Sequence, residues 1–306
     1  MRNAFADELT KLGSQDRRIV LLSGDIGNKL FDKFKAANED RYINCGVAEA
    51  NMMGVAAGMA LSGLRPVIYT IAPFTTTRCL EQIKVDACYH DVPVIIVGTG
   101  SGLSYAELGP THHSCEDMAI LRVLPGMTVL APGESRDLRE LLRAALNQNG
   151  PVYIRIGKKD EPQVYPDIMP PIKIGRATRI REGSDVCLIA TGTIMAEVVN
   201  AAKLLEEKGI SARIESFHTV KPLDTMCLSE SFSQYPLVAV IEEHSRLGGL
   251  AGSIAEWRVE QRGKLAEMIG FGVPDEFLHE VGTHEYAKNK YGLTAENISA
   301  KIMANL

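Results

Sequence analysis

One carboxylate lies in a segment whose other residues are mostly small or apolar. The segment reads Asn44-Cys45-Gly46-Val47-Ala48-Glu49-Ala50-Asn51, and apolar residues then recur at helical spacing as far as Ser62-Gly63, at Met52, Val55, Ala56, Met59 and Ala60. This pattern predicts a buried helix with Glu49 in its first turn. Burial opposes the negative charge and the helix N-terminus favours it, so Glu49 is suited to exchange a proton with a ligand nitrogen near neutral pH. An acidic residue that only favours the helix dipole is the alternative at this point.

Two adjacent histidines lie in a turn sequence further along the chain. The run Gly109-Pro110-Thr111-His112-His113-Ser114 presents two imidazoles, which can hydrogen-bond or transfer protons near pH 7. Neighbouring histidines can hardly bind one metal ion from a shared face, and no Asp or Cys lies at ligand spacing. We therefore expect no zinc site here and no metal ligand set in this chain.

Phe74 stands beside a polar run that offers its ring little to pack against. It follows a predicted strand and precedes Thr75-Thr76-Thr77, which we do not expect to be buried. The ring therefore either packs under its own loop or is covered by a ligand that stacks on it. Arg78 begins the next helix, with Glu81 and Lys84 nearby, and its charge can simply be paired on that surface.

Two cations follow the last strand of the first half of the chain. Arg155 and Lys158 belong to Val152-Tyr153-Ile154-Arg155-Ile156-Gly157-Lys158-Lys159, where a buried run ends. Open α/β sheets bind ligands beyond the carboxyl ends of their strands, and basic residues at that edge suit a phosphate. Solvated lysines that belong to a linker are the alternative.

Short β-rich runs alternate with helical runs, which predicts an α/β fold. Strands are expected over 19–23, 66–71, 92–98, 128–131 and 152–156, and a helix is expected over 134–148. Some strands, such as Pro93-Val94-Ile95-Ile96-Val97, are apolar throughout. Such strands predict mainly parallel sheets with helices on both faces.

The alternation lapses between Asp160 and Gly175, where four prolines exclude a helix. It then resumes with strands expected over 186–191, 212–217 and 237–242, and with helices over 194–207 and 294–306. We therefore predict one domain over residues 1–160, a Pro-rich linker over 161–174, and a second, smaller α/β domain over 175–306.

Size, charge and cysteine usage narrow the class of protein. The 306 residues suffice for about two domains of ordinary size. The net charge of −5 gives no electrostatic reason to expect nucleic acid or an anionic membrane as a partner. The amino terminus does not resemble a secretory signal, and no apolar run approaches the roughly 20 residues needed to span a bilayer. Six scattered cysteines are interpreted as reduced thiols, so a cytoplasmic protein is expected.

Several segments resemble the transketolase family in order and spacing, over nearly the whole chain. Gly46-Val47-Ala48-Glu49 is similar to the segment with the family's cofactor-activating glutamate, and Pro73 to Ile83 resembles the aromatic loop and helix that follow it. Gly109-Pro110-Thr111-His112 is similar to the substrate-side histidine motif. Resemblance to the carboxy-terminal domain of the family rests on Ile189–Gly192, His218–Asp224 and Glu242–Gly249.

The resemblance implies thiamine diphosphate as cofactor. Glu49 would then hydrogen-bond the ring nitrogen opposite the amino group of the pyrimidine and stabilise its imino tautomer, and Phe74 would stack on that ring. Asp25, in Ser23-Gly24-Asp25, superficially resembles the family's metal-binding Gly-Asp-Gly but stands at the end of the first strand. It is therefore interpreted as a cofactor-side or interface residue, and Arg78 is counted with the cofactor site.

The same resemblance assigns the substrate side. His112 would lie over the reacting carbons of a sugar, with His113 beside it where relatives often carry glutamine. Arg155 and Lys158 would bind the terminal phosphate of a sugar-phosphate-type substrate. Leu108 and the loop Gly98-Thr99-Gly100-Ser101-Gly102 depart from the usual pattern, so the donor and acceptor sugars stay open.

In the full-length family the diphosphate and its Mg²⁺ are bound by an upstream domain that this sequence does not contain. We therefore expect the carboxy-terminal subunit of a split transketolase, active only with an amino-terminal diphosphate-binding partner that supplies the Mg²⁺ ligands. Self-association through the helix of Glu49 is expected as well, giving a twofold-symmetric heterotetramer.

Other functions stay open on the sequence alone. The closest are the beta subunit of a 2-oxoacid dehydrogenase decarboxylase and an enzyme similar to 1-deoxyxylulose-5-phosphate synthase. Val97-Gly98-Thr99-Gly100-Ser101-Gly102 after a strand weakly resembles a dinucleotide fingerprint, although its third glycine is missing. If the chain were a noncatalytic scaffold subunit, the presence of Glu49, Phe74 and His112 in these motifs would be a coincidence.

Overall fold

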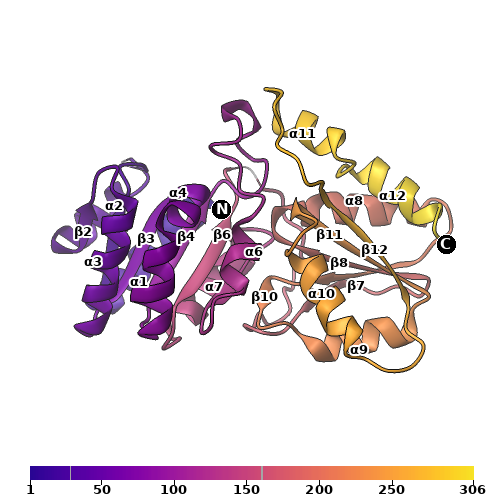
Figure 1. Cartoon of the computed structure of the whole chain (residues 1–306), viewed down its shortest axis with the longest axis horizontal. Helices are drawn as coiled ribbons and strands as arrows, with labels where there is room; N and C mark the ends of the chain where they lie inside the picture. Colours follow the sequence, from indigo (N-terminus) through magenta and orange to yellow (C-terminus); the bar gives the residue numbers. More distant parts are fainter. Residues whose placement is uncertain (28, 160) are drawn as a thin grey trace.

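Two β-sheets lie side by side in the molecule, the first formed mainly by the amino-terminal half and the second by the carboxy-terminal half (Figure 1). The computed structural model describes residues 1–27, 29–159 and 161–306. The predicted α/β class, with two mainly parallel sheets and helices on both faces of each, is confirmed. No described helix is both long enough and apolar enough to cross a bilayer.

The first sheet has the strand order β10-β5-β6-β4-β3-β1-β2, and every neighbouring pair is parallel except β10 with β5. Its strands are β1 (Ile19–Ser23), β2 (Tyr42–Asn44), β3 (Arg65–Ile71), β4 (Ile95–Thr99), β5 (Thr128–Leu130), β6 (Val152–Ile156) and β10 (Thr219–Lys221). The helices of this half are α1 (Arg2–Gln15), α2 (Asp32–Ala37), α3 (Glu49–Leu61), α4 (Ala72–Thr75), α5 (Leu80–Gln82), α6 (Asp117–Arg122) and α7 (Ser135–Leu146), with a π-helical segment over Ile83–Tyr89.

Alternation of side chains divides the core of this half into two layers. Ile19 and Leu21 of β1 pack with α1 and α7, whereas Val20 and Leu22 pack on the opposite face with α3 and the π-helical segment. Strands that are apolar on both faces can be buried only in this way, because each face needs its own helices.

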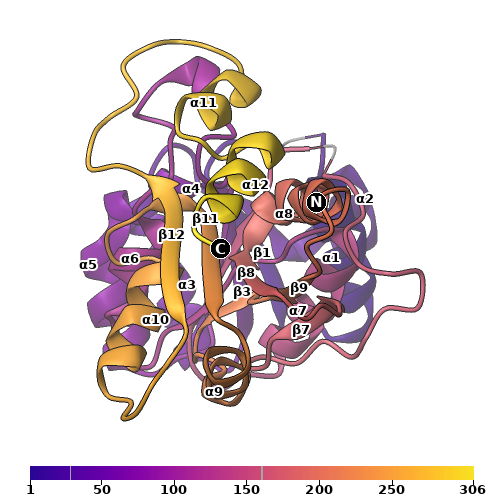
Figure 2. The same ribbon diagram turned by 90° about the vertical axis from the view of Figure 1, so that its right-hand side faces the viewer.

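The second sheet has the order β12-β11-β8-β9-β7, with β7 antiparallel to β9. Its strands are β7 (Thr178–Arg181), β8 (Val186–Thr191), β9 (Ala212–Ser216), β11 (Leu237–Ser245) and β12 (Glu267–Val273). The helices are α8 (Met195–Glu206), α9 (Thr225–Gln234), α10 (Leu250–Val259), α11 (His284–Lys290) and α12 (Ala295–Met303). Helices α8 and α12 cover one face, and α9 and α10 cover the other (Figure 2).

The predicted helix of Glu49 is confirmed over Glu49–Leu61, with one correction to its buried face. Met52, Ala56 and Ala60 are buried as expected, but Val55 is 39% exposed. The sequence pattern misplaced this residue because α3 presents Met53 and Ala57, and not Val55, to the sheet.

The segment 161–174 contains no helix or strand, but it is packed against both halves of the molecule. Tyr165 is buried, and its hydroxyl lies 3.0 Å from Asp137 Oδ2 and 2.9 Å from Ser216 Oγ. Asp160, where we expected the alternation to lapse, lies outside the described residues.

Strand β10 belongs to the second half of the sequence but pairs with the first sheet, where Thr219 faces Leu130. This strand pairing joins the two halves of the chain, and no sequence pattern had indicated it.

Candidate active site

The predicted site residues gather beyond the carboxyl ends of parallel strands of the first sheet. Asp25 follows β1, the segment leading to Glu49 follows β2, Phe74 follows β3, the loop with His112 follows β4, and Lys158 follows β6. Because these strands are parallel, the segments that follow them emerge at one edge of the sheet.

Glu49 lies in the first turn of α3 and is only 2% exposed. Its Oε1 lies 2.8 Å from Nη1 of Arg78, whose side chain is 42% exposed. Asn44 supports the turn before the helix, because its amide donates to Asp25 Oδ1 at 2.8 Å and its side-chain oxygen accepts from the Gly46 amide. Asp25 itself is exposed, and no contact joins it to Glu49 among the described residues.

Phe74 lies next to this ion pair. The guanidinium carbon of Arg78 lies 3.9 Å from the centroid of the Phe74 ring, so one cation contacts both the carboxylate and the aromatic face. The expectation that the neighbouring threonines would stay unburied was wrong for Thr75 and Thr76, which are buried. Their hydroxyls donate to the Ala72 carbonyl at 3.1 and 2.7 Å, and this hydrogen bonding removes the cost of burial.

His112 packs edge-on against Phe74, with ring centroids 5.3 Å apart, and against Tyr105 at 6.1 Å. Its Nδ1 lies 3.0 Å from Thr111 Oγ1. Burial, together with the nearby charge of Arg78, holds the pKa of His112 below its ordinary value. The imidazole is therefore neutral at pH 7 and able both to donate and to accept a hydrogen bond.

His113 lies apart from this row. It is buried, and it lines a separate cavity of about 390 Å³ with Pro110, Cys115 and Phe277. Burial lowers its pKa, and its Nε2 has no hydrogen-bond partner among the described residues. The two adjacent histidines thus face different environments, which sequence proximity did not reveal.

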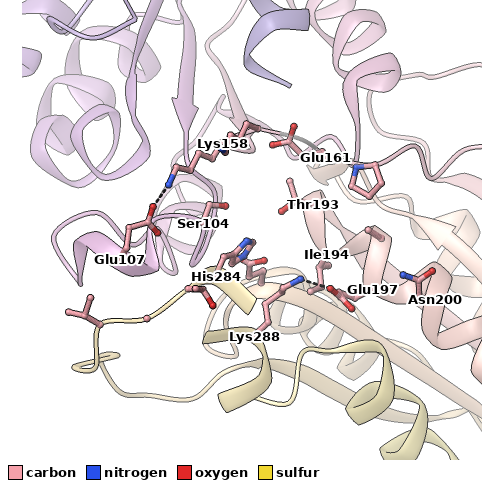
Figure 3. A pocket seen from close by; sticks show the side chains of 17 residues that line it. Ser104, Glu107, Lys158, Glu161, Thr193, Ile194, Glu197, Asn200, His284 and Lys288 are labelled. Atoms are coloured by element: carbon pink, nitrogen blue, oxygen red, sulfur yellow. Dashed lines mark hydrogen bonds and ion pairs between the residues drawn. The ribbon is translucent and has the colours of Figure 1, made fainter. Parts of the chain in front are cut away.

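Lys158 continues the row beyond Tyr105. Its ammonium forms an ion pair with Glu107 and lies 4.6 Å from the Tyr105 ring centroid. Both charged groups line a cleft of about 770 Å³ between the two halves of the chain, with His284 and Lys288 on the opposite wall (Figure 3). Glu49, Arg78, Phe74, His112, Tyr105 and Lys158 therefore form one contiguous row.

The interpretation of Arg155 as a substrate ligand needs correction. Arg155 is 2% exposed, and its Nε lies 3.0 Å from Asp117 Oδ2. Its Nη2 donates to the Ser114 carbonyl at 2.7 Å and to the Glu243 carbonyl at 2.8 Å. Every residue of β6 is buried, so Arg155 is enclosed within the protein, whereas Lys158 lies beyond the end of the strand and lines the cleft.

Sequence reasoning missed several residues in the row or beside it. Tyr105, Glu107 and His284 were not predicted to belong to a site. Glu243 appeared only as part of a family segment, yet it is buried and bonded to His284 Nε2 at 2.9 Å. Two adjacent glutamates at the end of an apolar run were the one available signal.

The glycine-rich loop after β4 does not form a dinucleotide site. The residues after β4 form an irregular loop with a short 3-10 turn at Ala106–Leu108 and do not open a helix. A dinucleotide fingerprint needs a helix N-terminus for the pyrophosphate, so this alternative is not supported. Among the described residues, no three His, Cys, Asp or Glu side chains are grouped so as to hold a metal ion.

Comparison with known families agrees with this arrangement. Residues 1–163 match the family described as "Transketolase, pyrimidine binding domain", and residues 175–298 match "Transketolase, C-terminal domain". The chain therefore belongs to the transketolase family. This confirms the family resemblance and the two folds inferred from the sequence.

Particular relatives are similar to the chain over nearly its whole length. An apulose-4-phosphate transketolase subunit of Phocaeicola vulgatus is 34% identical, over 97% of this chain and 94% of its own. The 6-deoxy-6-sulfo-D-fructose transketolase subunit SqwH of Clostridium sp. (strain MSTE9) is 36% identical, over 97% and 92%. A solved structure described as a split gene transketolase, inactive beta4 tetramer, is 37% identical with a TM-score of 0.90, over 99% and 97%. These relatives confirm a transketolase-type transferase subunit of the split kind.

The corrected role of Arg155 leads to a prediction about stability. Arg155→Ala should lower the free energy of unfolding by about 3–5 kcal/mol, because it leaves the Asp117 carboxylate buried without its cation. Denaturant unfolding of the purified chain measures this change, with the exposed Arg17→Ala as the matched control. A substrate-binding role would instead leave the unfolding midpoint near that of the control and raise only a Michaelis constant.

Proposed function

We propose that the chain is the carboxy-terminal subunit of a thiamine diphosphate-dependent split transketolase, which transfers a two-carbon ketol unit between sugar-phosphate-type substrates. The observation that carries the proposal is the contiguous row from buried Glu49 through Phe74 and His112 to Lys158. The row combines a proton-exchanging carboxyl, an aromatic face, a neutral imidazole and a cation in the order that ketol transfer requires. Full-length similarity to split transketolase subunits supports it.

The residues present fit a pyrimidine ring. The contacts of Arg78 support this fit, because its flat guanidinium is held by the Glu49 carboxylate at 2.8 Å and by the Phe74 face at 3.9 Å. Glu49 and Phe74 together therefore accommodate a flat, nitrogen-bearing group, and an aminopyrimidine is such a group. We keep Arg78 on the cofactor side because it contacts both groups, and Asp25 because it accepts a hydrogen bond from Asn44 in the segment that leads to Glu49.

Each side chain then has a distinct task. Bound thiamine diphosphate supplies the electron sink for cleavage of a carbon–carbon bond. Glu49 holds or moves a proton at its carboxyl oxygen, in a buried position where competing water is excluded. Neutral His112 donates and accepts hydrogen bonds to sugar hydroxyls, and Lys158 binds the anionic end of the substrate.

The diphosphate half of the site is assigned to a partner. We place the ligands of the diphosphate and its Mg²⁺ on an amino-terminal transketolase subunit, because this row offers the pyrimidine and substrate sides only. A second copy of the chain would pack on the exposed apolar residues of α3 and the adjacent π-helical segment, namely Val55, Leu61, Val85 and Tyr89. Twofold pairing on that face yields the expected heterotetramer.

Reconstitution tests the function directly. The chain should show no ketol transfer alone with thiamine diphosphate and Mg²⁺, and activity should appear on mixing with an amino-terminal transketolase subunit at equal stoichiometry. A ketose donor with an aldose-phosphate acceptor is the assay, accompanied by a mass determination of each sample. Robust transfer by the chain alone would defeat the split-subunit proposal. Decarboxylation of a 2-oxoacid without ketol transfer would favour the alternative enzymes.

Glu49→Gln should abolish turnover of the reconstituted complex, because the amide keeps the shape of the side chain but cannot exchange the proton. The expected loss is about 100-fold or more in kcat, with the fold unchanged by circular dichroism. The exposed Glu39→Gln is the matched control and should behave as wild type. Near-wild-type activity of Glu49→Gln would refute the central assignment.

Lys158→Ala should mainly raise the Michaelis constant for phosphorylated or similarly anionic substrates, by about tenfold or more, because a charge-assisted contact is lost. Steady-state kinetics with an anionic substrate and with a neutral analogue distinguish a role in binding the anionic group from a structural role. The exposed Lys208→Ala serves as control. Equal losses on both substrates would point to a structural role of the Lys158–Glu107 pair instead.

A further inference from the structure

The loop that carries His112 is packed against the carboxy-terminal domain as well as against its own. We call residues 100–114 the histidine loop. Leu103 and Ala106 of this loop are buried in the same apolar core as Val186 and Leu188 of β8, which belong to the second sheet. In both overall views the loop lies beside α11 (Figures 1 and 2). His112, near the other end of the loop, nevertheless packs against the Phe74 ring of the first half.

Glu243 holds the base of the histidine loop. Its Oε1 accepts a hydrogen bond from the Leu103 amide at 2.6 Å and another from His284 Nε2 at 2.9 Å. Its backbone carbonyl accepts from Arg155, and the same Arg155 nitrogen also donates to the Ser114 carbonyl at the other end of the loop. The first part of the loop is thus bonded directly to Glu243, and its far end is linked to Glu243 through Arg155.

The backbone of the histidine loop is shaped for this contact. Gly102 has φ of 55°, and a Cβ there would lie 2.5 Å from Glu243 Oε1. The Ser114 amide donates to the Gly102 carbonyl at 2.8 Å and closes the loop above the carboxylate. A glycine is therefore required at the point where the loop meets Glu243.

We propose that Glu243 and His284 are positioning residues, through which the carboxy-terminal domain fixes the histidine loop and hence the place of His112 over the substrate. This inference rests on the proposed function for the role of His112. It gives the carboxy-terminal domain a task in the reaction, although none of its residues belongs to the row from Glu49 to Lys158.

The charge of His284 makes the positioning dependent on pH. Glu243 raises the pKa of His284, opposed by burial and by Lys288 of the same helix, while Glu197 of α8 raises it further. Glu107 also faces it across the cleft, and Lys158, Lys159 and Glu161 line the same space. Because the folded-state pKa of His284 is raised, the charged pair with Glu243 is present below that pKa and is lost as the pH rises through it.

Kinetics of the reconstituted complex test the proposal. His284→Gln and Glu243→Gln should each lower kcat by about 10- to 100-fold, since small misplacement of a catalytic group costs that much. The dissociation constant for thiamine diphosphate should stay within about twofold of wild type. Lys290→Gln is the matched control, because Lys290 lies on the same helix as His284 and forms an exposed ion pair with Glu280, which precedes that helix; this variant should leave kcat unchanged.

The pH profile separates positioning from general damage. Wild-type kcat should fall as the pH rises through the pKa of His284, and His284→Gln should lack this fall. The proposal is overturned if His284→Gln keeps both the wild-type kcat and the alkaline fall. It is also overturned if kcat, cofactor affinity and unfolding midpoint decline together, because that outcome indicates a structural role only.

The attachment of the histidine loop can also be tested without measuring enzyme activity, so that this test does not depend on the proposed function. Hydrogen–deuterium exchange of the chain alone should show faster exchange over residues 100–114 in both variants and not in Lys290→Gln. Unchanged exchange in His284→Gln and Glu243→Gln would refute the attachment, whatever reaction the complex catalyses. If exchange rises but the complex transfers no ketol unit, the attachment stands and the proposed function fails.

Discussion

The buried guanidinium of Arg155 is the interaction on which the arrangement of the two halves depends. It comes from β6 of the first sheet, forms an ion pair with Asp117 of α6, and donates hydrogen bonds to the Ser114 carbonyl and to the Glu243 carbonyl of β11. A buried cation is costly unless its charge is paired, so these partners must come together for the protein to fold. The second sheet is thereby held against the first at the end where the candidate site lies.

Side-chain alternation along β11 distributes the polar contacts at this junction. Glu243 points to the histidine loop and to His284. Its neighbours point the other way, where Glu242 accepts the Leu250 and Ala251 amides at the start of α10 and His244 lies 3.8 Å from Asp117. Burial raises the pKa of Glu242 to about 7 and lowers the pKa of His244 to about 4, so both groups are costly to place inside the protein. Such an arrangement supports a fixed junction in place of a loose linker between domains.

The candidate site is a row of contacts that crosses from one side of the sheet edge to the cleft between the halves. Its polar groups are paired with one another, as Glu49 is with Arg78 and Lys158 is with Glu107. Ligands that enter must therefore replace these contacts with contacts of similar strength, which favours a nitrogen-bearing ring at the Glu49 end of the row and an anionic group at the Lys158 end.

Sequence alone determined the elements and the types of residue at the site. Strands over Ile19–Ser23, Val152–Ile156 and Val186–Thr191 follow from mainly apolar runs, in which Arg155 is the one charged residue, and α3 follows from helical spacing and from Glu49 at its start. These are local properties, because propensity and periodicity act over neighbouring residues. The same locality lets the sequence predict Glu49, Phe74, His112 and Lys158 as candidate site residues from their type and order along the chain.

Tertiary structure decided which of these residues face the site. Arg155 and Lys158 are three residues apart in sequence, yet one is buried at the junction and the other lines the cleft. His112 and His113 are adjacent, yet they face separate environments. Pairing of β10 with β5, and of Glu243 with the histidine loop, joins residues far apart in the chain. Local sequence patterns do not predict such contacts, because residues far apart in the chain meet only when the two sheets pack against each other.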